Sequence, residues 1–212
     1  MYLPAAFAED RLEVKHGLIR AYPLGMLVAT GTDGPSADLM PFMLYPDEGE
    51  HGVLRAHVAR ANPAWQALAA NGECLVVFQG PGSYISPTWY EAKRESHKVV
   101  PTWNYAMVQV RGAARVVEDG AWLHRLLGDL TAQHEQAMPQ PWAMSDAPPE
   151  FIDGLLRAIV GIELPIESIV GKWKVSQNRS AADMASIAAG LRQRDGGAMA
   201  GLVEARLPAA TP

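Results

Sequence analysis

Apolar residues recur every three or four positions in several stretches of the chain, which is the spacing of one face of an α-helix. Residues 121–138 show it most strongly, with Leu123, Leu126 and Leu130 on one face. Ser180 is a suitable N-cap for another such stretch, since its hydroxyl can accept a hydrogen bond from the first helical turn. Helices are therefore predicted over residues 10–21, 62–70, 121–138, 150–158 and 180–194.

Shorter apolar runs bounded by turn residues predict strands. The turn sequence T-D-G-P at 32–35 separates two of them, so residues 24–30 and 37–45 are expected to pair as a hairpin. Apolar and polar positions alternate over residues 105–118, which is typical of a strand with one polar face. Further strands are predicted over residues 53–58, 74–79 and 159–169.

Five or six short strands, with helices between and after them, indicate an α+β protein built on a small antiparallel barrel. The proline-rich stretch 139–149 interrupts the pattern. However, the strand predicted at 159–169 is too short to form a core of its own and needs a sheet to join. We therefore expect a single domain over residues 1–212, with C-terminal helices from about residue 180.

Composition narrows the class of protein. The chain of 212 residues is 49% hydrophobic and 19% charged, the balance of a soluble globular protein. A single cysteine, Cys74, rules out an intrachain disulfide and a multi-cysteine metal site. Charged residues interrupt the first 20 positions and no run is long enough for a membrane span, so we expect a cytoplasmic location and no membrane partner.

Several catalytic and binding motifs are missing from the sequence. Gly171-Lys172 is followed by Trp173, which has no hydroxyl for the magnesium ion of a P-loop. The sequence contains neither H-E-x-x-H nor G-x-S-x-G, so no metal ligand and no catalytic side chain is predicted. Lysine and arginine number 18 against 23 aspartate and glutamate, and this net charge of -5 counts against a dedicated DNA-binding protein.

The segment A-H-V-A-R-A-N-P-A-W at 56–65 runs from the end of a strand into a helix. Asn62 as N-cap and Pro63 as first helical residue leave free N–H groups at the positive end of the helix dipole. His57 and Arg60 lie just upstream, so the segment favours an anion such as a phosphate monoester. The alternative is that Asn62 only caps the helix and Arg60 is solvated.

Aromatic residues are dense in a predicted loop between residues 84 and 105. Four of them can form a flat wall for an aromatic ligand: Trp89, Tyr90, Trp103 and Tyr105. Asn104 offers a donor and an acceptor to a heterocycle edge. A loop packed down by its own aromatic rings explains the same sequence equally well.

A third segment, G-K-W-K-V-S-Q-N-R at 171–179, combines three cations with two amides between a strand and a helix. It can close over a ligand or meet an acidic partner surface. Alternatively, it is a strand end with exposed Lys172, Lys174 and Arg179.

These segments, in this order and with the opening M-Y-L-P-A-A-F, resemble the PaiB-type FMN-binding negative transcriptional regulators. The resemblance extends from the first residue to about residue 194. It implies an antiparallel split β-barrel related to pyridoxamine-phosphate oxidase-like proteins. It also implies a homodimer with FMN bound at the subunit interface.

The resemblance implies three groups of cofactor-binding residues. They are His57, Arg60 and Asn62 on the phosphate side, Trp103 and Asn104 near the flavin ring or its interface, and Lys174, Gln177 and Arg179 from the partner subunit. One motif departs from the family. Where the family reads A-T-H-L-P, residues 37–41 read A-D-L-M-P, so Leu39 replaces a histidine.

Three functions are consistent with these residues and with the resemblance. The first is an FMN-binding homodimer with a negative transcriptional regulatory role, whose direct contact with DNA the net charge does not support. The second is a flavin-dependent reductase or oxidase that acts on a small molecule in the same pocket. The third is a flavin-free dimerisation module, favoured if the change at Leu39 has disabled the site.

Overall fold

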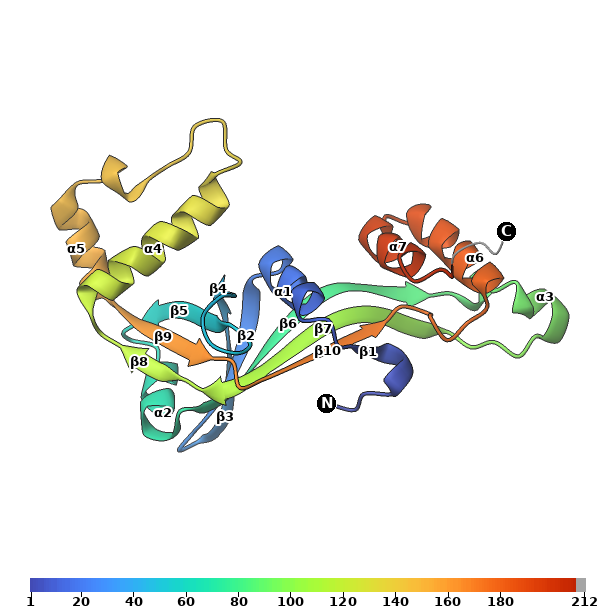
Figure 1. Cartoon of the computed structure of the whole chain (residues 1–212), viewed down its shortest axis with the longest axis horizontal. Coiled ribbons are helices and arrows are strands. Elements are labelled where there is room, and N and C mark those ends of the chain that lie inside the picture. The colour runs from blue at the N-terminus through green and yellow to red at the C-terminus, as the bar shows by residue number, and fades with distance from the viewer. Residues whose placement is uncertain (209–212) are drawn as a thin grey trace. The chain divides into compact units, whose positions relative to one another are not determined.

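The computed structural model describes residues 1–208, without the side chain of residue 95. The helices are α1 (Leu12–Ala21), α2 (Ala64–Asn71), α3 (Ala92–Ser96), α4 (Gly120–Glu135), α5 (Pro149–Arg157), α6 (Ala181–Arg192) and α7 (Gly197–Glu204). The strands are β1 (Ala8–Glu9), β2 (Leu24–Gly31), β3 (Gly34–Pro41), β4 (Met43–Tyr45), β5 (Val53–Ala59), β6 (Glu73–Ile85), β7 (Thr102–Ala113), β8 (Arg115–Val117), β9 (Ile159–Pro165) and β10 (Ser168–Lys174). Figure 1 shows these elements along the chain.

The chain divides into two compact units. Unit 1 comprises Met1–Lys15, Gln79–Val108 and the described part of Val170–Pro212, and unit 2 comprises His16–Phe78 and Gln109–Ile169. Strands β6, β7 and β10 each have residues in both units. The single-domain organisation therefore stays a prediction.

The predicted α+β class is confirmed. The antiparallel strand pairs include β1–β10, β2–β3, β2–β6, β4–β5, β5–β9 and β8–β9. In unit 1 the neighbouring strands are β1-β10-β7-β6. In unit 2 they are β7-β6-β2-β3 and, in a second sheet, β4-β5-β9-β8. The predicted hairpin is present as β2 and β3, and Gly34 at its turn has a φ of 100°, a conformation that favours glycine.

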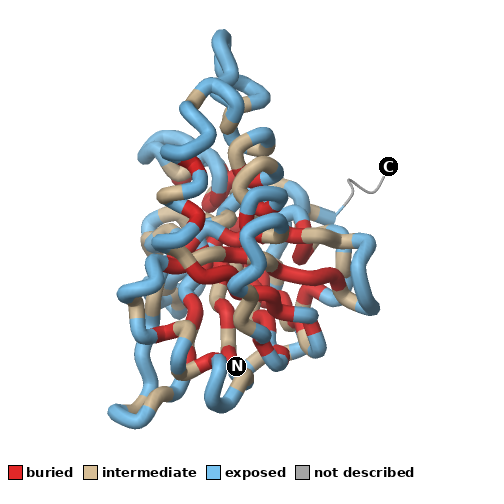
Figure 2. The backbone as a smooth tube through the Cα atoms, turned by 90° about the vertical axis from the view of Figure 1, so that its left-hand side faces the viewer, coloured by how far each residue is buried: buried red, intermediate tan, exposed pale blue. Residues whose placement is uncertain are grey.

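Unit 2 has its core between its two sheets. Phe42 and Phe78 are 1% and 0% exposed and meet edge to face with ring centroids 5.6 Å apart. Gly25 permits this packing, because a Cβ there would lie 2.7 Å from a Phe78 ring carbon. Buried positions gather in the strands, whereas loops and outer helix faces are exposed (Figure 2).

Unit 1 is built from strands with two helices on one side of them, α6 and α7 (Figure 1). The apolar stripe predicted for α6 is confirmed, since Met184, Ile187 and Leu191 are buried. Ser180 is the N-cap, and its hydroxyl accepts a hydrogen bond from the Asp183 N–H at 3.1 Å. Helix α6 therefore begins where its sequence predicts.

Three predicted strands are each split in the structure. Residues 37–45 form the end of β3 and all of β4, which belong to different sheets. Residues 159–169 form all of β9 and the start of β10, because the Ile166 N–H bonds to Gly52 and the Glu167 N–H bonds to Arg111 instead. Residues 105–118 are divided at Ala114, whose N–H bonds to Gly72 outside the strand ladder. The breaks at residues 166–167 and at Ala114 depend on hydrogen bonds to residues distant in sequence.

Two features are absent from residues 1–208, a membrane-spanning helix and a cluster of metal-binding side chains. No helix there has the length and apolar character to cross a membrane. Nor do three or more His, Cys, Asp or Glu side chains gather there in the arrangement of a metal site.

Candidate functional site

The predicted phosphate segment lies in unit 2, where β5 ends and α2 begins. The Asn62 Oδ1 atom accepts a hydrogen bond from the Ala64 N–H at 2.8 Å, so Asn62 satisfies an amide at the helix start. Helix α2 starts at Ala64 with Pro63 as its N-cap residue, so the prediction of Asn62 as N-cap and Pro63 as first helical residue is wrong by one position. The Asn62 Nδ2 atom donates to the Asp38 carboxylate at 3.0 Å, which ties the corner to β3.

Arg60 is not free, although its side chain is 40% exposed. Its Nε and Nη2 atoms donate to the carbonyls of Arg157 and Ile159 at 3.1 and 3.2 Å, and Nη1 donates to Glu118 at 2.5 Å. The guanidinium is thus oriented by carbonyls at the end of α5 and the start of β9 and by a carboxylate in the segment before α4. A phosphate at Arg60 would have to replace the Glu118 carboxylate.

His57, on β5, has a different environment from Arg60. Its Nδ1 atom is buried and has no hydrogen-bond partner among the described residues. Burial lowers the pKa of His57, so the imidazole is neutral at neutral pH. His57 therefore fits the role of a hydrogen-bonding group rather than that of a cation.

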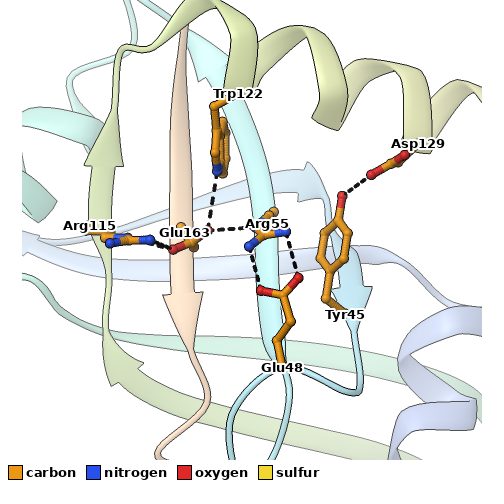
Figure 3. A network of polar contacts seen from close by, with 7 residues as sticks. All are labelled: Tyr45, Glu48, Arg55, Arg115, Trp122, Asp129 and Glu163. Atoms are coloured by element: carbon orange, nitrogen blue, oxygen red, sulfur yellow. Dashed lines mark hydrogen bonds and ion pairs between the residues drawn. The ribbon is translucent and has the colours of Figure 1, made fainter.

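A polar network next to this corner links β5, β9, β8 and α4 (Figure 3). Glu163 is 3% exposed, and its carboxylate accepts hydrogen bonds from the Nε atoms of Arg55 and Arg115, both at 2.6 Å. Trp122 Nε1 lies 3.4 Å from the same carboxylate. Burial opposes ionisation of Glu163, but the bonds from both arginines outweigh it and hold its pKa below the ordinary value.

The outer part of the network involves α4 and the turn after β4. Arg55 forms two bonds to Glu48, at 3.0 and 2.6 Å, and its guanidinium carbon lies 4.1 Å from the centre of the Tyr45 ring. The Tyr45 hydroxyl donates to Asp129 at 2.6 Å, and burial together with this bond raises the pKa of Tyr45 to about 12. Sequence reasoning missed this network, although a glutamate within the apolar strand I-V-G-I-E-L was a visible signal.

The predicted ring-side residues lie in unit 1, on β7. Trp103 is 60% exposed and Asn104 is 1% exposed, because successive residues of a strand point to opposite faces. The Asn104 Nδ2 atom donates to the Ser176 hydroxyl at 2.8 Å. Trp103 thus faces solvent, whereas the Asn104 amide is held inside the unit.

The four predicted aromatic residues do not form one wall. Tyr90 is 2% exposed, and Trp89 packs so closely on α6 that a Cβ at Gly190 would lie 2.6 Å from its ring. Trp103 instead meets Tyr84 edge to face, with centroids 6.2 Å apart. For Trp89 and Tyr90 the structure thus favours the alternative given above, in which aromatic rings pack against the protein instead of facing a ligand.

Part of the 171–179 segment lies next to Trp103. The Lys174 ammonium donates to the Trp103 carbonyl at 2.6 Å and to the Thr102 hydroxyl. Gln177 is used locally, since its side chain bonds to the Val175 N–H at 2.8 Å and to the Trp173 carbonyl at 2.5 Å. The remaining predicted residue of this segment, Arg179, has its guanidinium carbon 5.0 Å from the centre of the Tyr90 ring.

Comparison with known proteins assigns the chain to a family. Residues 1–168 match the family model described as “Putative FMN-binding domain”. The chain belongs to this FMN-binding family. Within it, the chain is 30% identical over 187 residues to Protease synthase and sporulation protein PAI 2 of Bacillus subtilis, covering 88% of this chain and 87% of that one. An uncharacterized protein of Emericella nidulans is 34% identical over 226 residues, covering 90% of each chain.

The split-barrel fold predicted for the FMN-binding family is confirmed by solved structures. Flavocytochrome Anf3 from Azotobacter vinelandii has a TM-score of 0.55 at 16% identity, covering 79% of this chain and 69% of that one. The FAD and heme binding protein from Mycobacterium smegmatis has a TM-score of 0.55 at 17% identity, covering 79% and 73%. At these identities the likeness concerns the fold.

The side chains of this family member fit an FMN group, which is a flat ring system with an anionic phosphate. Unit 1 presents exposed Trp103 next to Lys174, which has no carboxylate partner among the described residues. Unit 2 presents the Nδ1 atom of His57, which has no partner among the described side chains, and the start of α2, where Asn62 bonds to the Ala64 N–H. The chain thus carries ring-stacking, cationic and hydrogen-bonding groups, although Arg60 is already engaged by Glu118.

Proposed function

We propose that this chain binds FMN as a homodimer in the cytoplasm and acts as a negative regulator of transcription. The observation that carries the flavin proposal is the match to an FMN-binding family over residues 1–168. The cationic and aromatic groups described above support it. The candidate flavin contacts are taken for each unit by itself. They are His57, Arg60 and Asn62 in unit 2, and Trp103 and Lys174 in unit 1, with Asn104, Gln177 and Arg179 of unit 1 in supporting positions.

A visible absorption spectrum tests flavin binding directly. The purified full chain is mixed with FMN, desalted and scanned, and the chromophore released by denaturation is then identified. We expect about one FMN per chain, since one site per chain is proposed. A colourless protein would overturn the proposal, and a released FAD would overturn the choice of flavin.

The outer face of the β2–β3 hairpin supports the homodimer. Leu24, Met26 and Leu39 are 57%, 42% and 62% exposed, and Met26 pairs directly with Leu39. Soluble monomers rarely expose contiguous apolar patches, so a second copy is the expected cover. Leu39 stands where the family has histidine, which makes this patch more apolar in the present chain.

Light scattering after gel filtration tests this interface. We expect a dimer for the wild type and a monomer for Leu39→Asp, because a buried carboxylate without a partner is costly. Leu155→Asp is the matched control, since Leu155 is 48% exposed on α5 in a different part of unit 2. A monomeric wild type, or a Leu39→Asp variant that stays dimeric, would contradict the proposal.

The regulatory part of the proposal is supported by the relationship to the sporulation protein PAI 2. Because the chain has a net charge of -5, we expect regulation to act through the flavin or a protein partner rather than through direct DNA contact. A gel shift with promoter fragments at low and high salt tests this. A salt-sensitive shift with the flavin-bound or the flavin-free protein would refute the indirect route.

The second candidate function is a flavin-dependent reductase or oxidase. The exposed Trp103 favours it, because a tryptophan residue that is 60% exposed leaves room for a second aromatic molecule beside the flavin. Bleaching of the bound flavin by a reduced nicotinamide dinucleotide under anaerobic conditions tests it. Flavin that stays oxidised with both NADH and NADPH would exclude nicotinamide-driven turnover.

A further inference from the structure

A small hollow in unit 2 lies beside the polar network of Figure 3. It has a volume of about 220 Å³ and is walled by β4, β5 and α4. The lining residues are Tyr45, Arg55, Trp122, Arg125, Leu126 and Asp129. Liquid water takes about 30 Å³ per molecule, so the hollow has room for a small metabolite and is too small to enclose a flavin.

Part of the wall of this hollow is apolar or already neutralised. Leu126, which is 1% exposed, and Trp122 supply apolar surface. The guanidinium of Arg55 is paired with the carboxylates of Glu48 and Glu163, both at 2.6 Å. Arg55 therefore lines the hollow, but its charge is balanced before any ligand arrives.

The two other charged groups of the lining, Arg125 and Asp129, are not neutralised by the protein. They stand four positions apart on α4, so they occupy neighbouring turns of the helix. Within residues 1–208, neither forms an ion pair with the other or with any other described side chain. The order with the cation first is also the less favourable one for a pair on a helix. The hollow thus presents one cation and one anion that are separate from each other.

Asp129 is held in place from the opposite wall. The Tyr45 hydroxyl donates to its Oδ2 atom at 2.6 Å, which leaves Oδ1 as an acceptor for a ligand. Because the pKa of Tyr45 is raised to about 12, this hydroxyl keeps its proton at neutral pH. A carboxylate that is already oriented loses less conformational freedom when a ligand binds.

We propose that this hollow binds a small α-amino acid with an uncharged side chain. The ligand's carboxylate lies on Arg125, its ammonium lies on Asp129, and its side chain lies against Leu126 and Trp122. A simple anion would be repelled by Asp129, and a simple cation by Arg125, whereas a zwitterion satisfies both. A charged side chain would find no partner, since Arg55 is already paired.

The inference is independent of the proposed flavin function. None of the six lining residues belongs to the candidate flavin contacts, and all six lie within unit 2. Amino-acid binding is therefore expected with the FMN-loaded and with the flavin-free chain. A chain that binds an amino acid but no FMN refutes only the flavin proposal, and a chain that binds FMN but no amino acid refutes only this one.

Isothermal titration calorimetry on the full chain tests the proposal with glycine, L-alanine, L-leucine and L-methionine. We expect at least one of them to bind at one site per chain with a Kd below about 1 mM. The N-acetyl derivative of that amino acid lacks the ammonium, and its amide lacks the carboxylate. Each derivative should bind at least tenfold more weakly than the parent.

Two variants assign the charges. Arg125→Met and Asp129→Asn should each weaken binding of the amino acid at least tenfold, and Asp129→Asn keeps an oxygen for the Tyr45 hydroxyl. In Arg125→Met the amide should bind as well as the parent, because the partner of the carboxylate is gone. Arg125→Lys should recover part of the lost affinity. The matched controls are Arg157→Met and Asp153→Asn, which change exposed residues of α5 and should alter binding less than twofold.

Three results would overturn the proposal. The first is a wild type that binds none of the four amino acids, and the second is an N-acetyl derivative or an amide that binds as tightly as its parent. The third is a pair of control variants that weaken binding as much as the changes at Arg125 and Asp129. Circular dichroism spectra and melting temperatures of all variants separate a lost site from a misfolded chain.

Discussion

The buried carboxylate of Glu163 offers the sharpest test of how unit 2 is held together. The substitution Glu163→Gln keeps the shape of the side chain and removes its charge. The variant leaves Arg115 without its carboxylate partner and turns an amide N–H group or oxygen toward Arg55. Strands β5, β8 and β9 and helix α4 meet at this carboxylate, so its loss weakens several elements at once.

The structure sets the size of this effect. Removing one partner of a fully buried ion pair costs about 3–5 kcal/mol. Here Arg55 keeps its two bonds to Glu48, and the Arg115 side chain is 70% exposed, so much of that penalty is relieved. We therefore expect a loss of about 2 kcal/mol, within the range of a hydrogen bond to a charged group. For a chain of this size that lowers Tm by about 4–8 °C.

Thermal unfolding followed by circular dichroism measures this difference. Glu118→Gln is the control, because its pair with Arg60 joins side chains that are 56% and 40% exposed, and such a pair contributes at most about 1 kcal/mol. Equal Tm values for the two variants would refute the assignment of Glu163 as a buried structural charge.

The pH dependence of the Tm difference between wild type and Glu163→Gln gives a second test of the role of the charge. The pKa of Glu163 is lower in the folded protein than its ordinary value of 4.5. The stabilisation by its charge is therefore complete above about pH 4.5 and is lost as the pH falls through the lowered pKa. The Tm difference between wild type and Glu163→Gln should narrow below pH 4.5. A difference that stays constant down to pH 3 would show that packing rather than charge is responsible.

Three further predictions follow from single side chains. Arg60→Ala should reduce the flavin retained after desalting without unfolding the protein, as measured by absorbance and circular dichroism, and full retention would place the phosphate elsewhere. Gly190→Ala should lower the urea midpoint, because its Cβ would lie 2.6 Å from the Trp89 ring and overpacking costs about 1–3 kcal/mol, whereas Gly201→Ala, with open space around it, should not. Burial raises the pKa of the Cys74 thiol to about 11, so a thiol reagent at pH 8 should label it only after denaturation, and rapid labelling of the native protein would contradict its burial.

The sequence determined the local elements and the family. Periodic leucines predicted α4, and the structure adds an Asp119 cap, whose carboxylate accepts the Trp122 N–H at 2.7 Å. A helix of this kind depends on residues a few positions apart, where backbone geometry sets which side chains lie together. The loop predicted between residues 84 and 105 is wrong at its end, because β7 begins at Thr102 and points Trp103 and Asn104 to opposite faces.

Only the tertiary structure decided the partners of the candidate site residues. Arg60 is held by carbonyls 97 and 99 positions away, and Lys174 reaches Trp103 across 71 positions. The pairing of Arg55 with Glu163 spans 108 positions. A charged side chain in the sequence shows its capacity to bind, but whether a carboxylate already occupies it depends on which strands become neighbours. The sequence makes both Arg60 and Lys174 candidate anion-binding residues. In the fold Arg60 pairs with Glu118, whereas Lys174 pairs with no carboxylate among the side chains that the structure describes.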